Sequence, residues 1–237
     1  CPVIVKAHPA HPGASELVAV AIGRAAEQSG MPPGVFSLVH GGAAESRYLV
    51  QHPLLKAVGF TGSQRAGRAL YDLAAARPEP IPVFAEMGSV NPVFILPDYL
   101  QKNGAALASG LCGSITLGVG QFCTNPGLVV TIENPGLPVF LNALAQNIQN
   151  TAPGVMLSQG IQANYRQGLE RLSAQAGVER VAGAPEAGQN QGAAAILRVA
   201  AKQFVENDLL QEEVFGPSSL VVVGENAGQL NAVVDKL

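Results

Sequence analysis

The sequence predicts an α/β fold with a parallel sheet, and two observations carry this prediction. Short β-branched or apolar runs alternate with helical stretches along most of the chain, which is typical of consecutive βαβ units. Apolar residues make up 48% of the 237 residues and charged residues only 13%, as in a globular chain with a large buried core. We therefore expect strands that are covered by helices.

The first part of the chain predicts two strand–helix–strand units. The run Val3-Ile4-Val5 is β-branched, and His11-Pro12-Gly13 breaks the chain before an amphipathic stretch. Thr61-Gly62-Ser63 is expected to be a tight turn that leads into a helix. Strands are thus predicted over residues 3–5, 35–39, 56–60 and 81–85, and helices over residues 15–28, 44–51 and 67–76.

The second part predicts further strands and helices with a soft boundary near Gly88, so that the expected domains are residues 1–87 and 88–237. Residues 178–191 are rich in Gly, Ala and Gln and are expected to form a loop. The chain begins inside an apolar run without a Met, so we expect an internal piece of a longer protein. Strands are predicted over residues 93–96, 128–132, 193–199 and 220–223, and helices over residues 100–112, 137–150, 162–177 and the last few residues.

Charge and cysteine usage exclude several classes of function. The net charge is −3 and the pI near 5.8, with no run of Lys or Arg, which argues against nucleic-acid and anionic-membrane partners. Three cysteines without a C-x-x-C spacing indicate a reducing, cytoplasmic compartment. No metal site is predicted, because His8 and His11 have no Cys or carboxylate close by in the sequence.

Cys123 is the candidate nucleophile. It follows an aromatic residue and precedes a Pro-Gly turn and the β-prone run over residues 128–132, so we expect it on a loop at the mouth of a strand. A reactive thiolate needs such an exposed position and nearby donors. The alternative is a buried structural cysteine, because a single free Cys is more often buried in the core than catalytic.

Four further candidates lie at the ends of predicted strands or in turns. Ser63 is expected at a helix N-terminus, where unpaired N–H groups can hold a phosphate, or where it simply caps the helix. Lys6 ends a strand, where it could meet a ligand or solvent. Glu86 follows a strand and suits general-base work, or it is a surface glutamate. The segment around Glu213 could bind a ligand or be an acidic turn.

The order of these motifs resembles the NAD(P)-dependent aldehyde dehydrogenase superfamily over nearly the whole chain. Within it, Lys-Ala-His-Pro-Ala-His-Pro and Gln-Phe-Cys-Thr-Asn-Pro-Gly are most similar to the branch with α-ketoglutaric semialdehyde (2,5-dioxovalerate) dehydrogenases and NADP-dependent fatty aldehyde dehydrogenases. The motifs that carry the resemblance are Lys6 in Val-Ile-Val-Lys, Phe60-Thr61-Gly62-Ser63 with Gly67, Glu86-Met87-Gly88 with Asn91-Pro92, Gly120-Gln121-Phe122-Cys123, and Glu212-Glu213-Val214-Phe215-Gly216-Pro217.

The resemblance implies an incomplete Rossmann-type cofactor sheet followed by an incomplete α/β catalytic domain. It implies that Cys123 attacks the aldehyde to give a thiohemiacetal and then a thioester, and that Glu86 activates the water that hydrolyses the thioester. The substrate implied is a small-molecule aldehyde, with α-ketoglutaric semialdehyde first and a long aliphatic aldehyde still open. Relatives form dimers and tetramers, so a homo-oligomer is expected.

The resemblance also implies the cofactor residues. Lys6 corresponds to the residue at the adenosine ribose and Ser63 to the one near the pyrophosphate. Glu213 corresponds to the carboxylate that holds the nicotinamide ribose, with Phe215 packed nearby. The remaining residues assigned to the cofactor are Gly62 and Met87.

NADP is the expected cofactor, with NAD also accepted. Relatives that prefer NAD tend to carry an acid three residues after the lysine, and this chain has Pro9 there. Without that acid, Lys6 is able to meet a 2′-phosphate. Arg47 is a further candidate for the phosphate.

Three departures from the family pattern leave alternatives open. The Asn that donates to the oxyanion in relatives lies upstream of residue 1, the opening strand and the C-terminal oligomerisation strand have no counterpart, and Ser89 replaces a second Gly. Inactivity of this piece alone is therefore expected. A coenzyme A-acylating dehydrogenase, which Glu86 disfavours, and a non-catalytic nucleotide-binding chain are the other hypotheses.

Overall fold

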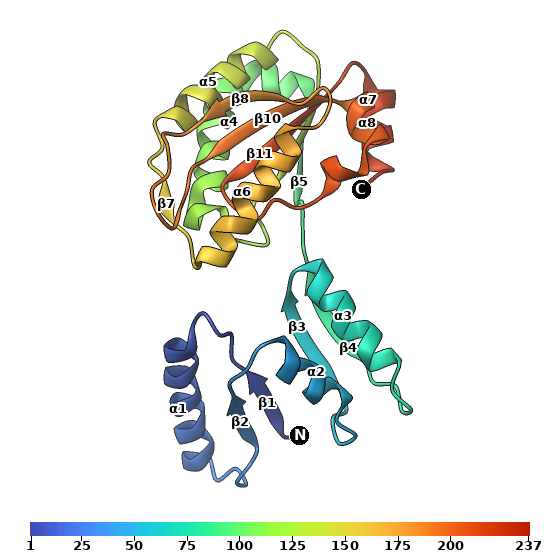
Figure 1. Cartoon of the computed structure of the whole chain (residues 1–237). Coiled ribbons are helices and arrows are strands. Elements are labelled where there is room, and N and C mark those ends of the chain that lie inside the picture. The colour runs from blue at the N-terminus through green and yellow to red at the C-terminus, as the bar shows by residue number, and fades with distance from the viewer. The chain divides into compact units, whose positions relative to one another are not determined.

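The structure is a computed structural model that describes residues 1–237, and the chain divides into two compact units, Cys1–Gly88 and Ser89–Leu237 (Figure 1). Both units combine helices with strands that pair mainly in parallel, so the predicted α/β fold is confirmed. The assignment of the first unit to the cofactor and the second to catalysis stays a prediction.

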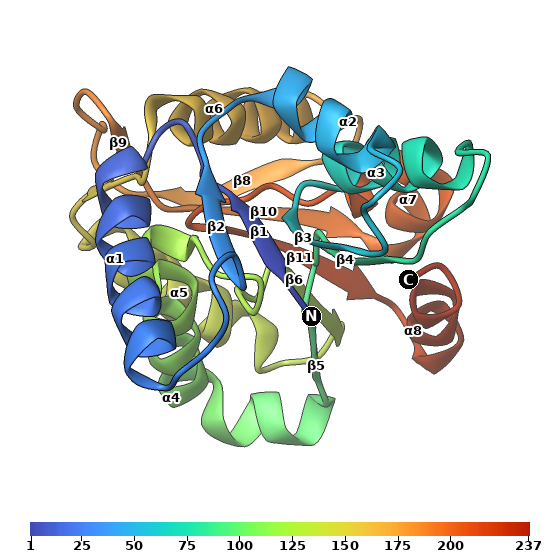
Figure 2. The ribbon, with the colours of Figure 1, turned by 90° about the horizontal axis from the view of Figure 1, so that it is seen from below.

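The first unit consists of two βαβ arrangements, each with a two-stranded parallel sheet. In the first arrangement, α1 lies alongside β2 in both ribbon views (Figures 1 and 2). A short helix, α2, leads from the first arrangement to the second. The elements are β1 (Val3–Lys6), α1 (Pro12–Gln28), β2 (Phe36–Val39), α2 (Ala43–Gln51), β3 (Val58–Gly62), α3 (Gln64–Ala75) and β4 (Val83–Met87).

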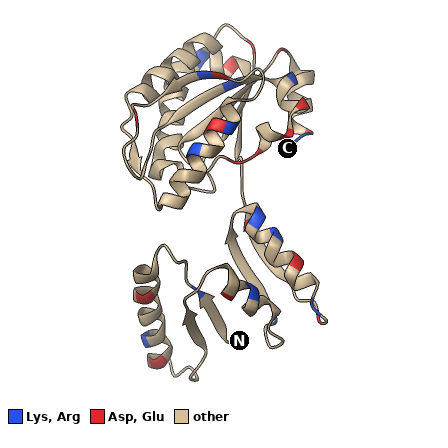
Figure 3. Cartoon of the chain, in the orientation of Figure 1, with Lys and Arg blue, Asp and Glu red and all other residues tan.

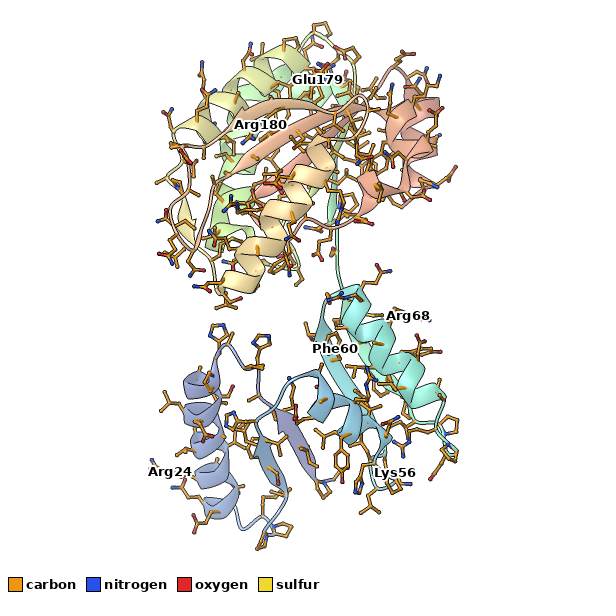
Figure 4. The ribbon with its side chains drawn as sticks, in the orientation of Figure 1. Arg24, Lys56, Phe60, Arg68, Glu179 and Arg180 are labelled. Atoms are coloured by element: carbon orange, nitrogen blue, oxygen red, sulfur yellow. The ribbon has the colours of Figure 1, made fainter.

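Helix α3 packs on its strand pair through a glycine. A Cβ atom on Gly67 would lie 2.3 Å from Sδ of Met87 and 3.3 Å from Cδ1 of Phe60. The helix therefore approaches β3 and β4 more closely than any larger residue would allow. Figure 4 labels Phe60 on β3 and Arg68 on α3.

Both strands of this pair end later than predicted. The parallel ladder pairs Thr61 with Glu86 and Gly62 with Met87, so hydrogen bonding carries each strand past the apolar run that signalled it. The expected tight turn at residues 61–63 is therefore wrong, because two of its residues belong to β3. Glu86 likewise lies inside β4 as its penultimate residue and does not follow the strand.

The second unit is a five-stranded sheet in the order β5-β6-β11-β10-β8. The strands are β5 (Pro92–Ile95), β6 (Leu128–Ile132), β8 (Glu179–Gly183), β10 (Ala195–Ala200) and β11 (Ser218–Gly224). All seven residues of the central strand β11 are buried, as expected for a parallel strand that is covered on both faces. A separate short antiparallel pair joins β7 (Gly154–Val155) to β9 (Gln191–Gly192).

Helices cover both faces of this sheet. One face packs against α4 (Pro97–Thr116) and α5 (Leu137–Gln149), with Leu100 and Phe140 fully buried between the layers. The other face packs against α6 (Gln159–Ser173), α7 (Ala201–Glu206) and α8 (Ala227–Val234), with Phe204 at the centre. Two short 3₁₀ helices complete the unit: η1 (Leu117–Gly120) and η2 (Asp208–Gln211).

The loop predicted over residues 178–191 is wrong in part, because β8 lies within it. This edge strand pairs antiparallel with β10, with an irregularity between Ile196 and Leu197. Its first two residues, Glu179 and Arg180, are charged and exposed, and Figure 4 labels both on β8. Polar residues are common on edge strands, and here they hid the strand from an apolar-run criterion.

Charges of both signs are spread over the surfaces of the two units, as Figure 3 shows for α1 and α3. None of the helices has the length and apolar character needed to cross a lipid bilayer.

Candidate active site

Cys123 lies on the connection between η1 and β6, and its side chain is exposed. Its neighbour Phe122 is about half exposed, and the backbone N–H of Asn125 donates to the carbonyl of Phe122 over 3.0 Å. This hydrogen bond closes a tight turn around the cysteine. The predicted loop position at the mouth of β6 is therefore where the structure has the thiol.

The chain approaches this turn through three consecutive left-handed residues. Gly118, Val119 and Gly120 have φ values of 54°, 60° and 64°. A Cβ atom on Gly120 would lie 2.4 Å from the carbonyl carbon of Gly216, so only glycine fits against this backbone. A β-branched residue such as Val119 rarely adopts this conformation, and the surrounding contacts must hold it there.

Amide side chains fix the cysteine loop from three directions. Gln121 donates through Nε2 to the Gly118 carbonyl over 3.1 Å and accepts at Oε1 from the Leu157 N–H over 2.8 Å. Asn125 donates through Nδ2 to the carbonyls of Gly216 and Ser218 over 3.2 and 3.4 Å.

The third amide belongs to Asn91, which donates through Nδ2 to the carbonyl of Thr124. Asn91 itself has a φ of 38°, a conformation that Asn adopts more readily than most residues. Both residues that flank the cysteine loop on its C-terminal side, Thr124 and Asn125, are thus held by hydrogen bonds to segments distant in sequence.

Glu213 lies in the turn that follows η2, next to the same loop. Its Oε1 accepts from the backbone N–H of Ser89 over 3.2 Å. Partial burial raises the pKa of the Glu213 carboxyl, and the Ser89 N–H opposes this effect. Glu213 and Phe215 line a cavity of about 30 Å³ together with Phe122, the neighbour of the cysteine.

Tyr165 on α6 packs against Gly216, at the end of the turn that contains Glu213. A Cβ atom on Gly216 would lie 2.3 Å from the Tyr165 ring, so the ring packs directly against the backbone there. The Tyr165 hydroxyl donates to the carbonyl of Ala193 over 2.7 Å. Burial raises the pKa of this hydroxyl, which keeps it protonated and able to donate.

The predicted cofactor residues of the first unit lie at carboxyl ends of its strands. Lys6 is the last residue of β1, and its Nζ donates to the carbonyl of Gly41 over 3.3 Å. Gly62 ends β3, and Ser63 is the N-cap of α3, where its side chain accepts from the Ala66 N–H over 3.3 Å. The cap uses one N–H group of the first turn, and the others remain available to an anion.

Glu86 and Met87 occupy opposite faces of β4. Met87 packs on Gly67 of α3, and side chains alternate along a strand, so Glu86 points to the side away from that helix. The Glu86 side chain is exposed. A carboxylate in this position is open to water and to ligands.

In the second unit, Glu213 and Phe215 line one cavity with Phe122, the residue before Cys123. In the first unit, Gly62, Ser63, Glu86 and Met87 lie together at the ends of β3 and β4. Sequence reasoning missed the supporting roles of Asn91, Gln121 and Asn125. These residues stood inside quoted motifs, and amides next to a nucleophile could have signalled the support. Tyr165 carried no local signal, because its partners lie 28 residues or more away in the chain.

Comparison with known proteins gives consistent matches. The model of the aldehyde dehydrogenase family matches residues 1–233. Alpha-ketoglutaric semialdehyde dehydrogenase 2 of Azospirillum brasilense is 49% identical over 240 aligned positions, covering 100% of this chain and 46% of that protein. Alpha-ketoglutaric semialdehyde dehydrogenase of Acinetobacter baylyi is 40% identical, covering 100% and 45%. The chain thus spans about half the length of the curated relatives it matches.

Solved structures share the fold. Proline utilization A of Bradyrhizobium japonicum, in the variant D778Y, matches with a TM-score of 0.79 at 21% identity, over 99% of this chain and 24% of that one. A protein of Sinorhizobium meliloti 1021, described as a candidate methylmalonate-semialdehyde dehydrogenase and solved with NAD, matches with a TM-score of 0.78 at 20% identity, over 98% and 48%.

Proposed function

The chain belongs to the aldehyde dehydrogenase family, and on that premise we propose that the protein oxidises an aldehyde to the carboxylate with Cys123 as nucleophile and NADP as oxidant. The observation that carries this proposal is the exposed Cys123 on a loop held by Asn91 and Asn125, beside a cavity lined by Glu213. A nucleophile needs this combination of access and fixed geometry.

Cys123 begins the reaction. Its thiolate attacks the aldehyde carbon, a carbon–sulfur bond forms, and the carbonyl oxygen becomes an oxyanion. The backbone N–H of Cys123 donates to this oxyanion and stabilises it. When bound, NADP supplies the oxidising power, because its nicotinamide accepts a hydride from the former aldehyde carbon. Cys123 then carries the acyl group as a thioester.

Glu86 completes the reaction as general base. It takes a proton from water, the water oxygen attacks the thioester carbon, and the carbon–sulfur bond breaks to release the carboxylic acid and the thiolate of Cys123. The exposed position of Glu86 at the end of β4 supports this role, since a base of this kind needs access to water.

The residues at the strand ends fit a dinucleotide. The Lys6 ammonium and the N-terminal N–H groups of α3 next to Ser63 are donors suited to phosphate oxygens. Gly62 at the end of β3 leaves that approach open. Met87 at the end of β4 offers apolar surface. In the second unit, Glu213 offers a carboxylate to ribose hydroxyls, and Phe215 offers apolar surface. Pro9 in place of an acid after Lys6 supports NADP over NAD.

The proposed substrate is α-ketoglutaric semialdehyde. The support is the name shared by the two relatives that are 49% and 40% identical over the whole chain.

Single-turnover formation of NADPH from α-ketoglutaric semialdehyde by the corresponding full-length protein, followed by absorbance, tests the proposal. Wild type should turn over, Cys123→Ala should give no reduced cofactor, and Glu86→Gln should give one burst and then stall. Reduction of NADP by Cys123→Ala would overturn the assignment of the nucleophile. Addition of coenzyme A separates the acylating alternative, which predicts an acyl-CoA product. Absence of turnover by wild type, together with a Cys123 that labels no faster than in unfolded chain, would favour a nucleotide-binding role.

A further inference from the structure

Lys6 and Glu45 meet at the backbone of Gly41, beyond the ends of β1 and β2. The two strands are in parallel register with Lys6 opposite Val39, so the loops after both strands leave the sheet at the same place. The Lys6 ammonium donates to the Gly41 carbonyl over 3.3 Å. A Cβ atom on Gly41 would lie 2.5 Å from Cγ and 2.9 Å from Oε2 of Glu45, so the Glu45 side chain lies directly against the same residue.

The helix cap of α2 fixes the Glu45 carboxylate in this place. Glu45 is at the third position of α2, and its Oε2 accepts from the Gly42 N–H over 2.7 Å. Hydrogen bonds from the backbone of Glu45 and Gly42 lower the pKa of the Glu45 carboxyl, and the charge of Lys6 lowers the pKa further. The carboxylate is therefore ionised at neutral pH and held at the N–H of Gly42, one residue from the carbonyl to which the Lys6 ammonium donates.

The other acid at this edge is already paired. Glu16 accepts from Nε2 of His40 over 2.6 Å. Glu45 is thus the carboxylate whose charge acts on Lys6, although Glu45 follows β2 and not β1. In βαβ units that bind dinucleotides, a carboxylate after the second strand accepts from the ribose 2′-hydroxyl and repels a 2′-phosphate.

We propose that Glu45 is a specificity-determining residue for the cofactor: its carboxylate, held against Gly41 beside Lys6, accepts from the adenosine ribose of NAD and weakens the binding of the 2′-phosphate of NADP. This inference rests on the proposed function, in which Lys6 lies at that ribose. Glu45 supplies a carboxylate to the site from the loop after β2. NAD-preferring relatives tend to carry their acid at the position of Pro9, in the loop after β1. The preference for NADP is then limited by Glu45.

Isothermal titration of the protein with NAD and with NADP tests the inference without relying on turnover. Glu45→Gln removes the charge and keeps an oxygen that can accept from the Gly42 N–H, so the cap of α2 is retained. We expect Glu45→Gln to bind NADP about fivefold more tightly relative to NAD, the size typical of one charge at an exposed site. Glu27→Gln makes the same change in net charge near the far end of α1 and should leave the ratio of the two affinities unchanged.

The outcomes separate the inference from the function on which it rests. If wild type binds both nucleotides and Glu45→Gln leaves the ratio unchanged, or if Glu27→Gln shifts it equally, the role of Glu45 is wrong while the proposed function stands. If wild type binds neither nucleotide, the proposed function fails and this inference fails with it. If Lys6→Ala weakens NADP more than NAD and Glu45→Gln has the opposite effect, both hold.

Discussion

The side-chain amide of Asn125 donates to the carbonyl of Gly216 over 3.2 Å and so joins the loop of Cys123 to the turn of Glu213, 91 residues further along the chain. This relationship couples two residues that the proposed reaction uses at the same time. The nucleophile and the carboxylate for the nicotinamide ribose are therefore expected to depend on one hydrogen-bonded unit.

Replacing Asn125 with Ala should remove the two hydrogen bonds to Gly216 and Ser218. We expect a loss of about 1–2 kcal/mol in the free energy of unfolding, and a fall in kcat that exceeds the change in KM for the aldehyde. Asn103→Ala is the matched control, because Asn103 donates only to Tyr99 within its own helix. Urea unfolding and steady-state kinetics measure the two effects, and equal losses in both variants would contradict the prediction.

Replacing Gly120 with Ala should be far more damaging than an ordinary Gly-to-Ala change. The left-handed backbone, and the 2.4 Å that would separate the new Cβ atom from the Gly216 carbonyl carbon, together should cost about 2–5 kcal/mol of unfolding free energy. Gly110→Ala, at an exposed site of α4 with nothing within 4 Å, should instead be neutral or stabilising by up to about 1 kcal/mol. Chemical denaturation of both variants gives the comparison.

Thiol labelling should distinguish the three cysteines. Cys123 and Cys1 are exposed, whereas Cys112 on α4 is only 8% exposed and lies 3.6 Å from the Thr151 hydroxyl. In the folded protein a small alkylating reagent should modify Cys123 and Cys1 and spare Cys112 until the protein is unfolded. Peptide mass analysis of wild type and of Cys123→Ser identifies the sites. Rapid labelling of Cys112 in the folded protein would contradict the burial of this residue on α4.

The partly buried Glu213 should make stability depend on pH. Its pKa is raised in the folded state, so ionisation disfavours folding. Its contribution is most favourable below the unfolded value, about pH 4.3, and is lost as the pH rises through the higher folded value. Glu213→Gln should therefore gain stability relative to wild type as the pH rises from 4 to 7. Urea unfolding of both proteins between pH 4 and 7 gives the difference in their free energies of unfolding. A stability gain of Glu213→Gln that grows as the pH falls would contradict the prediction.

Local patterns in the sequence predicted most elements and the exposed loop position of Cys123. The bounds of β6 match the apolar run over residues 128–132, because a buried parallel strand is apolar on both faces. The predicted end of β4 was wrong, because the hydrogen-bonded ladder with β3 continues through Glu86 after the apolar residues end. The strand β8 was missed because charged residues open it.

The support of the cysteine loop could not be predicted in the same way. The pairing of β6 with β11 brings Asn125 to Gly216, and the pairing of β5 with β6 brings Asn91 to Thr124. A sequence pattern shows that an amide is present but does not show which distant carbonyl it meets. The packing of Tyr165 against Gly216 likewise depends on the whole fold, because Tyr165 lies on helix α6.

The left-handed run from Gly118 to Gly120 has a consequence for covalent inhibitors of Cys123. Because Gly120 has the backbone of residues 216–217 directly against it, the loop cannot shift toward that backbone at Gly120 when an electrophile reacts. A warhead must therefore match the existing approach to the sulfur, since induced fit at this loop would require the Glu213 turn to move as well. Small, shape-matched electrophiles should outcompete bulky ones of equal intrinsic reactivity.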